Sequence, residues 1–111
     1  MMFKKDLLEK VISGLKTQTR RLHKKTLRKG KIYALKKNWL ENTGEYIKIT
    51  KVYHQKLSEI TQEEIIKEGF SSLEEFRDAW IRINGSWETE TIVKVYEFEL
   101  AEHPPKQSRL E

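Results

Sequence analysis

The sequence predicts an α+β fold in which helices flank a small curved sheet or barrel. Segments with helical apolar spacing alternate with runs rich in β-branched and aromatic residues, in the order helix, strands, two helices, strand. The chain has 111 residues, no cysteine, and no linker rich in proline or glycine before residue 103. We therefore expect a single domain with one core, built without disulfides.

The first expected element is a short helix that ends near residue 14. Asp6 followed by Glu9 is a capping-box pattern. Gly14 suits the left-handed position that ends a helix. Apolar residues between these signals recur at helical spacing, at Leu7, Leu8, Val11, Ile12 and Leu15. The polar residues 14–21 are therefore expected to form the exit from this helix.

Two strands and a turn are expected next. Residues 31–39 are typical of a strand introduced by Gly30, and residues 46–57 are typical of a longer one. In the longer strand Ile47 and Ile49 share one face, whereas Val52 falls on the other, which predicts a bulge near residues 50–51. Residues 41–44 form a hairpin-type turn, so the two strands are expected to be neighbours.

Two capped helices are expected after these strands. Thr61 with Glu64 starts the first, which Gly69 ends, and Ser72 with Glu75 starts the second, which residues 84–85 end. The apolar residues of these helices are Ile65 and Ile66 in the first and Leu73, Phe76, Trp80 and Ile83 in the second.

Residues 91–100 are expected to form the last strand, because they are rich in β-branched and aromatic residues. Val93 and Val95 occupy one face at its start, so part of the strand is expected to be covered on both sides. The other face carries Ile92, Tyr96, Phe98 and Leu100.

The cations are concentrated in one segment. From Lys10 to Lys37 there are eleven Lys or Arg and no Asp or Glu; subtracted from totals of 22 and 17, this leaves 11 cations and 17 anions elsewhere. The segment therefore carries +11 and the remainder −6, which favours a polyanionic partner on one side of the molecule. A solvated basic surface is the alternative interpretation. The acidic later half leaves an adaptor role open, for which solvated helix faces are the simpler explanation.

Residues 14–21, Gly-Leu-Lys-Thr-Gln-Thr-Arg-Arg, match the signature Gly-x-Lys-Thr-x-Thr-x-Arg, and with this motif the chain resembles the ASCH family, whose fold is similar to the PUA β-barrel. Residues 30–33, 60–70 and 95–98 resemble further segments of that family in the same order. The resemblance implies one PUA-like domain over residues 1–101, a small β-barrel with flanking helices. We expect residues 102–111 to be a flexible tail.

The resemblance also implies that the domain binds RNA or a nucleotide-like ligand in a cleft between barrel and helices. Cations supply affinity for phosphates, whereas base recognition requires hydrogen bonds and a stacking surface. Tyr33 and Trp39 are the nearest aromatic residues in sequence, although strand aromatics more often fill cores. The residues that we expect at this basic cleft are Lys16, Thr17, Arg20, Arg21, Lys24, Lys25, Arg28 and Lys29.

A second hypothesis is catalytic. One branch of the family, which the chain resembles at Lys16, Thr19 and Glu68, consists of small amidohydrolases that remove the acyl group from acetylated cytidine. The resemblance implies that Thr19 attacks the amide carbonyl and Lys16 accepts its proton, while Glu68 orients the lysine or assists the leaving amine. A lysine with its usual pKa of about 10.4 is protonated at neutral pH. This role therefore requires burial or nearby cations to lower that pKa, and a surface ion pair is the structural alternative for Glu68.

Other kinds of site are not indicated. Without cysteine, and with three histidines that are not clustered, the sequence predicts no metal site and no cofactor. It contains no P-loop, no Gly-x-Gly-x-x-Gly and no Gly-x-Ser-x-Gly motif. No apolar run approaches the roughly 20 residues that cross a bilayer, and acids among the first ten residues argue against a signal peptide. We expect a cytoplasmic monomer that does not contact membranes.

Overall fold

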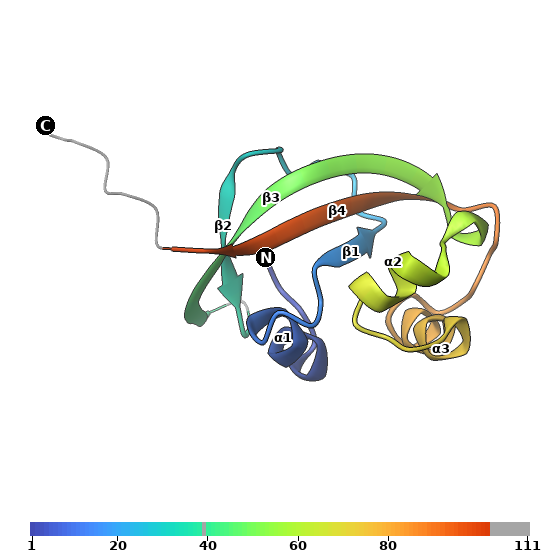
Figure 1. Cartoon of the computed structure of the whole chain (residues 1–111), viewed down its shortest axis with the longest axis horizontal. Coiled ribbons are helices and arrows are strands. Elements are labelled where there is room, and N and C mark those ends of the chain that lie inside the picture. Colours follow the sequence, from blue (N-terminus) through green and yellow to red (C-terminus); the bar gives the residue numbers. More distant parts are fainter. Residues whose placement is uncertain (39, 103–111) are drawn as a thin grey trace, which may run out of the picture.

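The computed structural model describes residues 1–38 and 40–102 (Figure 1). In this part of the chain helices and strands alternate in an α+β fold, as the sequence predicts. The elements are α1 (Lys5–Ile12), β1 (Gln18–Arg21), β2 (Ile32–Lys36), β3 (Asn42–Lys56), the 3-10 turn η1 (Leu57–Glu59), α2 (Gln62–Lys67), α3 (Leu73–Asn84) and β4 (Ile92–Ala101). Trp39 and the expected tail beyond residue 102 lie outside the described residues.

The strands of the described residues form one four-stranded antiparallel sheet in the order β1-β4-β3-β2. β1 and β2 are its edges and do not pair with each other, so the sheet is curved but not closed into the barrel that we expected. The N-terminal segment occupies the gap between these edges. Met2 makes a parallel bridge with Lys36 beside β2, and Arg21 at the end of β1 donates to the carbonyl of Met2 at 2.9 Å.

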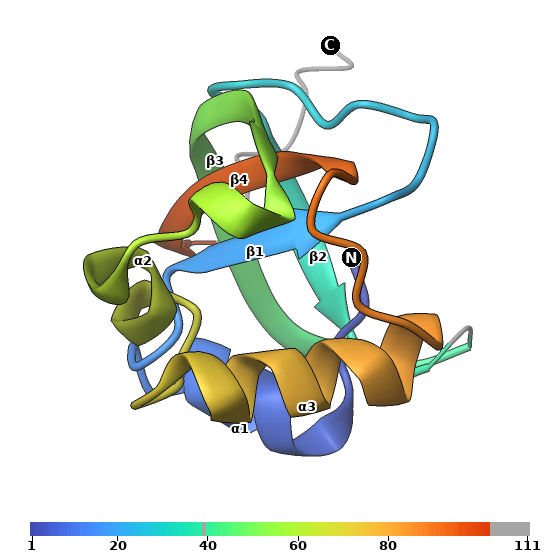
Figure 2. The ribbon, with the colours of Figure 1, turned by 90° about the vertical axis from the view of Figure 1, so that its right-hand side faces the viewer.

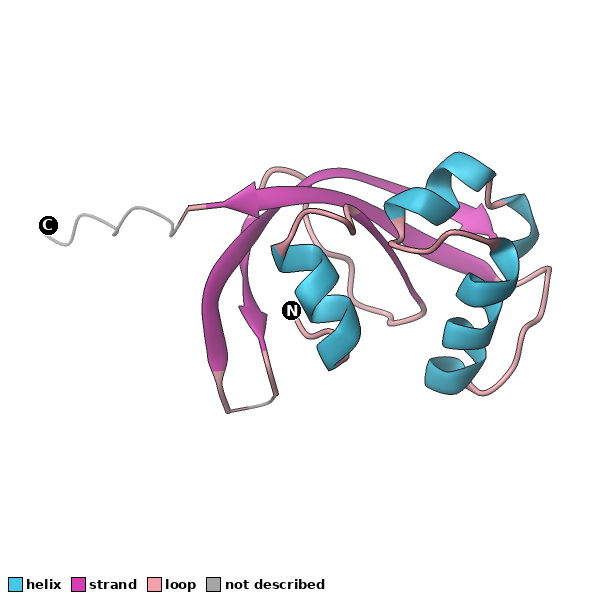
Figure 3. Cartoon of the chain, turned by 60° about the horizontal axis from the view of Figure 1, so that its bottom comes forward, coloured by secondary structure: helices cyan, strands magenta, loops and turns pink. Residues whose placement is uncertain are grey.

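Helix α1 lies inside the curve of the sheet, and α3 lies next to α1 (Figures 2 and 3). Two apolar clusters result, rather than the single core that we expected. Phe70 packs against both clusters and joins them. Buried members of the first are Phe3, Leu7, Leu8, Val11, Leu35, Ile47, Ile49, Tyr96 and Phe98, and those of the second are Leu57, Phe76, Trp80, Val93 and Val95.

The division into two clusters follows from the pleat of β4 and the bulge of β3. Val95 and Tyr96 are consecutive and both fully buried, so they face opposite sides of the strand. The predicted bulge is confirmed as a register shift between Ile49 and Lys51. Because of this shift, Val52 pairs with Tyr96 and packs against the first cluster together with Ile49.

The turn between β2 and β3 lies earlier than the sequence suggested. The side-chain oxygen of Asn38 accepts hydrogen bonds from the backbone N–H groups of Leu40 and Glu41. This local hydrogen bonding turns the chain before residue 42, so β3 already begins at Asn42 and includes three of the residues expected to turn, 42–44.

The start of α1 also differs from the prediction. The helix begins at Lys5, its N-cap residue Lys4 makes no side-chain cap hydrogen bond, and Asp6 lies in the first turn. Phe3, two residues before the helix, is buried in the first cluster. The helix then begins at once, so Asp6 lies inside it rather than at the N-cap. Beyond the helix, Leu15 is 66% exposed and is not part of the buried stripe.

The caps of α2 and α3 are confirmed, and they place the next residues. The Thr61 hydroxyl accepts from the backbone N–H of Glu64, and the Glu64 carboxylate accepts from the backbone N–H of Thr61. Ser72 caps α3 in the same way, although Glu75 binds Ser71 rather than completing the box. Helix α2 therefore ends at Lys67, and Glu68 is its C-cap residue.

Candidate functional site

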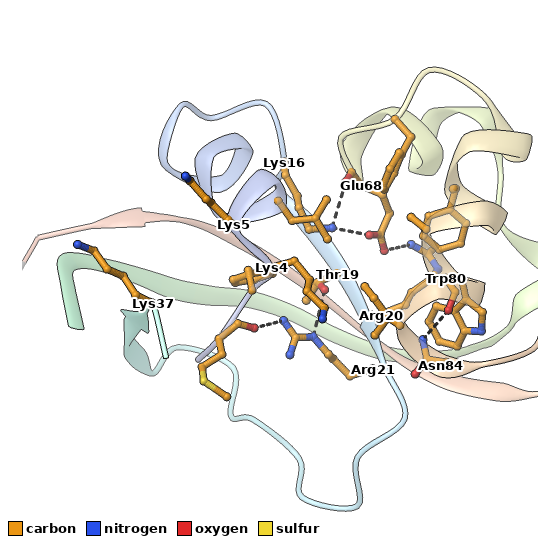
Figure 4. Close-up of a pocket in the computed structure, with 17 residues that line it drawn as sticks. Lys4, Lys5, Lys16, Thr19, Arg20, Arg21, Lys37, Glu68, Trp80 and Asn84 are labelled. Carbon is orange, nitrogen blue, oxygen red and sulfur yellow. Dashed lines mark hydrogen bonds and ion pairs between the residues drawn. The ribbon is translucent and has the colours of Figure 1, made fainter. Parts of the chain in front are cut away.

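A cavity of about 470 Å³, here called the pocket, lies between α1, β1, α3 and the end of α2 (Figure 4). One wall is apolar and largely aromatic, with Phe3, Leu7, Phe70, Phe76, Ala79, Trp80 and Ile83. Polar groups come from the segment around β1 and from the end of α2, with Lys16, Thr19, Arg20, Arg21 and Glu68. Three exposed residues that we call the mouth lysines, Lys4, Lys5 and Lys37, also line it. The pocket is an apolar recess with a charged end.

The pleat of β1 distributes the Gly-x-Lys-Thr-x-Thr-x-Arg motif over two faces of the sheet. Thr19 pairs with Tyr96, whose side chain belongs to the first cluster, whereas Arg20 pairs with Val95 of the second. Thr19 and Arg21 therefore face Phe3 and the N-terminal segment. Gln18 and Arg20 face β3 and α2. Since β1 is an edge strand, the pocket can reach side chains on both of its faces.

The carboxylate of Glu68 joins two cations of the motif. Its Oε1 lies 2.6 Å from Nζ of Lys16, and its Oε2 lies 2.8 Å from Nη1 of Arg20. All three side chains are buried, with at most 3% of each exposed. Breaking such a buried network leaves a charge without a partner, which is strongly destabilising. Glu68 therefore fixes the end of α2 against β1.

The guanidinium of Arg20 is engaged by protein groups. It donates to the side-chain oxygens of Gln18 at 2.6 Å and of Gln55 at 2.7 and 3.1 Å, in addition to Glu68. Glu64 adds an ion pair, with its Oε2 at 3.1 Å from Nη2 of Arg20. Arg20 thus has little hydrogen-bonding capacity left for a ligand.

The ammonium of Lys16 also has a full set of acceptors. It donates to the backbone carbonyls of Gln18 at 2.9 Å and Glu68 at 3.0 Å, and to the Glu68 carboxylate. Burial lowers the pKa of Lys16 below its ordinary value of 10.5, although the Glu68 carboxylate acts in the opposite direction. Arg21 and Arg20 lower this pKa further. The geometry is that of a charged lysine whose proton is easier to remove than usual.

Glu64 forms the outer part of the same network. Its carboxylate accepts hydrogen bonds from the hydroxyl of Tyr53 and from the side-chain amide of Gln55. Burial by itself raises the pKa of Glu64, but these hydrogen bonds, a backbone N–H and Arg20 outweigh it and lower that pKa to about 2. In Tyr53, burial and the same hydrogen bond to Glu64 raise the pKa of the phenol. Glu64 is therefore held as a carboxylate beside Arg20.

Thr19 and Arg21 face the pocket together. The Nε of Arg21 donates to Oγ1 of Thr19 at 3.3 Å, and its guanidinium lies 4.7 Å from the ring centre of Phe3. Burial lowers the pKa of the Arg21 guanidinium below its ordinary value, and the Glu68 charge opposes this change. Thr19 as a whole is 4% exposed and lines the pocket, so a group that reaches its side chain must enter the pocket.

Gly69 allows α1 and the end of α2 to approach closely. Its φ is +94°, and a Cβ at this position would lie 3.1 Å from Cδ of Lys10 and 3.3 Å from Cβ of Lys16. The ammonium of Lys10 donates to the carbonyl of Gly69 at 2.6 Å and lies 4.7 Å from the ring centre of Phe70. This contact sets the position of Phe70 in the pocket wall.

The structure thus brings Lys16, Thr19, Arg20, Arg21 and Glu68 to one pocket but not the remaining predicted residues. Thr17 is half-buried and joins the neighbouring elements through its backbone, which binds Lys67 and Phe98. The other four are exposed on the loop between β1 and β2 and do not line the pocket, and they are Lys24, Lys25, Arg28 and Lys29.

The aromatic residues of the pocket are not those nearest to the motif in sequence. Tyr33 packs against the first cluster, and its hydroxyl accepts from the backbone N–H of Arg28. Trp39 lies outside the described residues. Phe3, Phe70, Phe76 and Trp80 line the pocket instead. The helical spacing of Phe76 and Trp80 predicts that they are buried, but not that a cavity remains beside them.

Two further features concern only residues 1–38 and 40–102. No group of three or more His, Asp or Glu side chains is placed to hold a metal ion there. No helix in that part of the chain is both long and apolar enough to cross a membrane.

A family model and a solved structure that match this chain both describe the ASCH domain. The family model of the ASCH domain matches residues 1–102. An ASCH domain from Lactobacillus crispatus has a TM-score of 0.74 to this chain at 16% sequence identity, over 88% of this chain and 72% of that one. Protein EF3133 from Enterococcus faecalis has a TM-score of 0.67 at 16% identity, over 86% of this chain and 67% of that one.

A variant of the ZmASCH protein from Zymomonas mobilis is also similar, with a TM-score of 0.65 at 11% identity, over 89% of this chain and 66% of that one. No curated protein matches the sequence. At these identities the likeness to solved structures establishes a shared PUA-like fold.

Proposed function

This chain belongs to the ASCH domain family, which is generally associated with RNA binding, and on this basis we propose that it binds RNA or a nucleotide-like ligand with one nucleobase held in the pocket. The observation that carries the proposal is the composition of the pocket. Aromatic rings of Phe70, Phe76 and Trp80 form its wall, and polar groups of the motif form its end. Aromatic rings stack on bases, and a few fixed polar groups orient them.

The size of the pocket supports a single base rather than a strand. A volume of about 470 Å³ lies within the usual range for small-molecule sites. Sequence-specific proteins commonly recognise single-stranded RNA by splaying out individual bases and stacking them on aromatic side chains. A strand whose backbone passes outside the pocket would place one base inside it.

The exposed cations between β1 and β2 are suited to the backbone of such a strand. None of Lys24, Lys25, Arg28 and Lys29 has an acidic partner within ion-pair distance among the described residues. Cations on exposed loops contact phosphates without reading sequence. Their role in the proposal is affinity, whereas base selection belongs to the pocket.

The test is the salt dependence of binding, measured by fluorescence anisotropy with a labelled single-stranded RNA. With about four phosphate contacts, the slope of log affinity against log salt is expected near −3, from roughly 0.7 per contact. Replacing Lys24 and Arg28 together by Gln is expected to reduce the slope by roughly 1.4. A matched double variant, Lys48→Gln with Arg77→Gln, removes two other exposed cations and should leave it unchanged. A flat response in the wild type would contradict RNA binding.

A second candidate, deacetylation of N4-acetylcytidine, is favoured by one specific observation. Lys16, Thr19 and Glu68 line the same pocket, and the lysine and the carboxylate are 2.6 Å apart. Proton transfer requires separations of about 3 Å, and burial lowers the pKa of Lys16. A lowered pKa and a nearby group that can take up its proton are two of the conditions that a lysine needs to act as a general base.

In this candidate mechanism the hydrogen bonds of Lys16 call for a proton transfer before the attack. Because its ammonium already donates to three acceptors, Lys16 must first pass one proton to the Glu68 carboxylate. Oγ1 of Thr19 then forms a bond to the acetyl carbonyl carbon while its proton moves to the amine of Lys16. The amide C–N bond breaks as Lys16 protonates the leaving amine of cytidine, and water hydrolyses the acetyl ester on Thr19 to acetate.

Chromatography of incubations with N4-acetylcytidine tests this candidate. The wild type is expected to release cytidine and acetate, and Thr19→Ala is expected to abolish release while it retains a normal thermal melt. Thr50→Ala, which removes an exposed threonine hydroxyl on β3, is the matched control and should behave as the wild type. Equal release by Thr19→Ala, or none by the wild type, would reject the mechanism.

A further inference from the structure

The charges that line the pocket are not balanced. One lining residue, Glu68, is acidic, and six are basic, namely Lys4, Lys5, Lys16, Arg20, Arg21 and Lys37. Lys16 and Arg20 are neutralised within the protein, because each forms an ion pair with Glu68 and Arg20 forms another with Glu64. Arg21 and the mouth lysines are the lining cations that are not neutralised by an acidic residue among the described residues.

Arg21 is the cation of the motif that lacks an acidic partner. Among the described residues no carboxylate lies within ion-pair distance of its guanidinium. Its Nε donates to Thr19 and its Nη2 donates to the carbonyl of Met2, whereas no described residue accepts from Nη1. A partly buried guanidinium without a counter-charge is costly, and a bound anion would offset that cost.

The mouth lysines extend the same positive region to the surface. Lys4, Lys5 and Lys37 are exposed, and their ammonium groups have no acidic partner among the described residues. In the view of Figure 4, Lys5 and Lys37 lie on one side of the pocket and Trp80 on the other, with Thr19 and Arg21 between them. Two of the mouth lysines therefore lie across the pocket from Trp80, and Lys4 lies near Thr19 between them.

From this arrangement we infer that the ligand of the pocket carries a phosphate, bound by Arg21 and the mouth lysines, while its base lies against the aromatic wall. The ligand is accordingly a nucleotide, free or within a strand, rather than an uncharged nucleoside. The placement of the base rests on the proposed function, whereas the anion site rests on the charges alone. A guanidinium and several ammonium groups are the usual partners of phosphate in proteins.

Isothermal titration calorimetry compares matched ligands. The probes are the four ribonucleosides and N4-acetylcytidine, the 5′-monophosphate of each, the corresponding dinucleotides, and inorganic phosphate. At 50 mM salt a monophosphate is expected to bind roughly ten- to hundredfold more tightly than its nucleoside, which is the range for a charge-assisted hydrogen bond. The preference should shrink at 200 mM salt. Tighter binding of dinucleotides than of monophosphates would identify a strand as the source of the phosphate.

Variants locate the phosphate. Arg21→Gln is expected to bring the affinity for the monophosphate down to that for the nucleoside, and Arg21→Lys to retain part of the preference. If Arg21 variants unfold, Lys37→Gln at the mouth gives an independent answer, with a smaller loss confined to the phosphorylated ligands. Arg77→Gln and Lys48→Gln, at exposed positions outside the pocket, are the matched controls and should not change the ratio.

The outcomes separate the two ideas. If nucleosides bind as tightly as their monophosphates, or if Arg77→Gln lowers the ratio as much as Arg21→Gln, the phosphate site is overturned while the base pocket stands. If inorganic phosphate binds in a manner that requires Arg21 but no base-containing ligand binds more tightly, the anion site stands and the proposed function fails. Absence of binding by every probe overturns both.

Discussion

The ammonium of Lys16 lies 2.6 Å from a carboxylate oxygen of Glu68, although 52 positions separate the two residues in the chain. One residue precedes β1 and the other is the C-cap of α2, so this pair ties the beginning of the sheet to the end of the helix. Two positions after Glu68, Phe70 lines the pocket, and its ring contacts Phe76 of α3 and the ammonium of Lys10 in α1.

Glu68→Gln is expected to destabilise the protein strongly, because it leaves the buried cations Lys16 and Arg20 without their shared partner. The free energy of unfolding, measured by urea denaturation, should fall by about 3–5 kcal/mol. Lys56→Gln is the control, since it breaks an ion pair with Glu90 that lies on the surface and should leave the urea midpoint unchanged. Similar losses in the two variants would mean that the buried network does not stabilise the fold.

Stability is expected to depend on Glu64 at acidic pH. The pKa of Glu64 is about 2 in the folded protein and 4.5 ordinarily, so its contribution is present above pH 4.5 and is lost as the pH falls toward 2. Glu64→Gln should therefore reduce the difference in unfolding free energy between pH 6 and pH 3. Glu74→Gln, an exposed position in the first turn of α3, should retain the wild-type difference. The same difference in all three proteins would contradict the assignment.

Gly69→Ala is expected to cost more than its backbone conformation alone explains. Gly69 and Gly85 share a φ of +94°, but only at Gly69 would the new methyl group meet other atoms, those of Lys10 and Lys16. Gly85→Ala measures the left-handed strain alone, about 1–2 kcal/mol. The excess loss in Gly69→Ala, and a weaker affinity for the pocket ligand that Gly85→Ala does not share, would report crowding at the site. Equal losses of stability in the two variants would indicate that Lys10 and Lys16 move aside without cost, so that Gly69 is not needed for close approach.

Filling the pocket is expected to abolish ligand binding without unfolding the protein. Ala79 on α3 is buried and lines the cavity, so Ala79→Leu places extra atoms in open space, where overpacking costs little. Affinity for the nucleotide probes should fall at least about tenfold, while the thermal midpoint changes little. Arg77→Leu, an exposed residue of the same helix, is the control. Unchanged affinity in Ala79→Leu would place the ligand elsewhere.

Local signals predicted much of the fold because they are complete within a few residues. The caps at Thr61 and Ser72 and the left-handed glycines at positions 69 and 85 depend only on neighbours in the chain. The bulge of β3 was predictable because a change of apolar parity within one strand requires an extra residue.

The strand character of β1 was not predictable in the same way. Gln18, Thr19 and Arg20 are polar, so they lack the apolar alternation that indicates a strand. Their burial depends on partners distant in sequence, such as Gln55 and Glu68. The resemblance to the family identified Lys16, Thr19 and Glu68 as candidates. The aromatic wall and the mouth lysines come from several separate segments, so their meeting at one pocket depends on tertiary packing that no single segment of the sequence encodes.

The bulge in β3 also decides which face of the sheet the second half of that strand serves. Up to Ile49 one face of β3 serves the apolar cluster beneath α1, and after the bulge Tyr53 and Gln55 reach the ionic network around Arg20 from the opposite face. If β3 kept all its residues but lost the bulge, so that Thr50 paired like its neighbours, the phase of everything that follows would invert, and Tyr53 and Gln55 would turn to the face of Ile49. One inserted residue thus lets a continuous ribbon line a hydrophobic interior at one end and an electrostatic interior at the other.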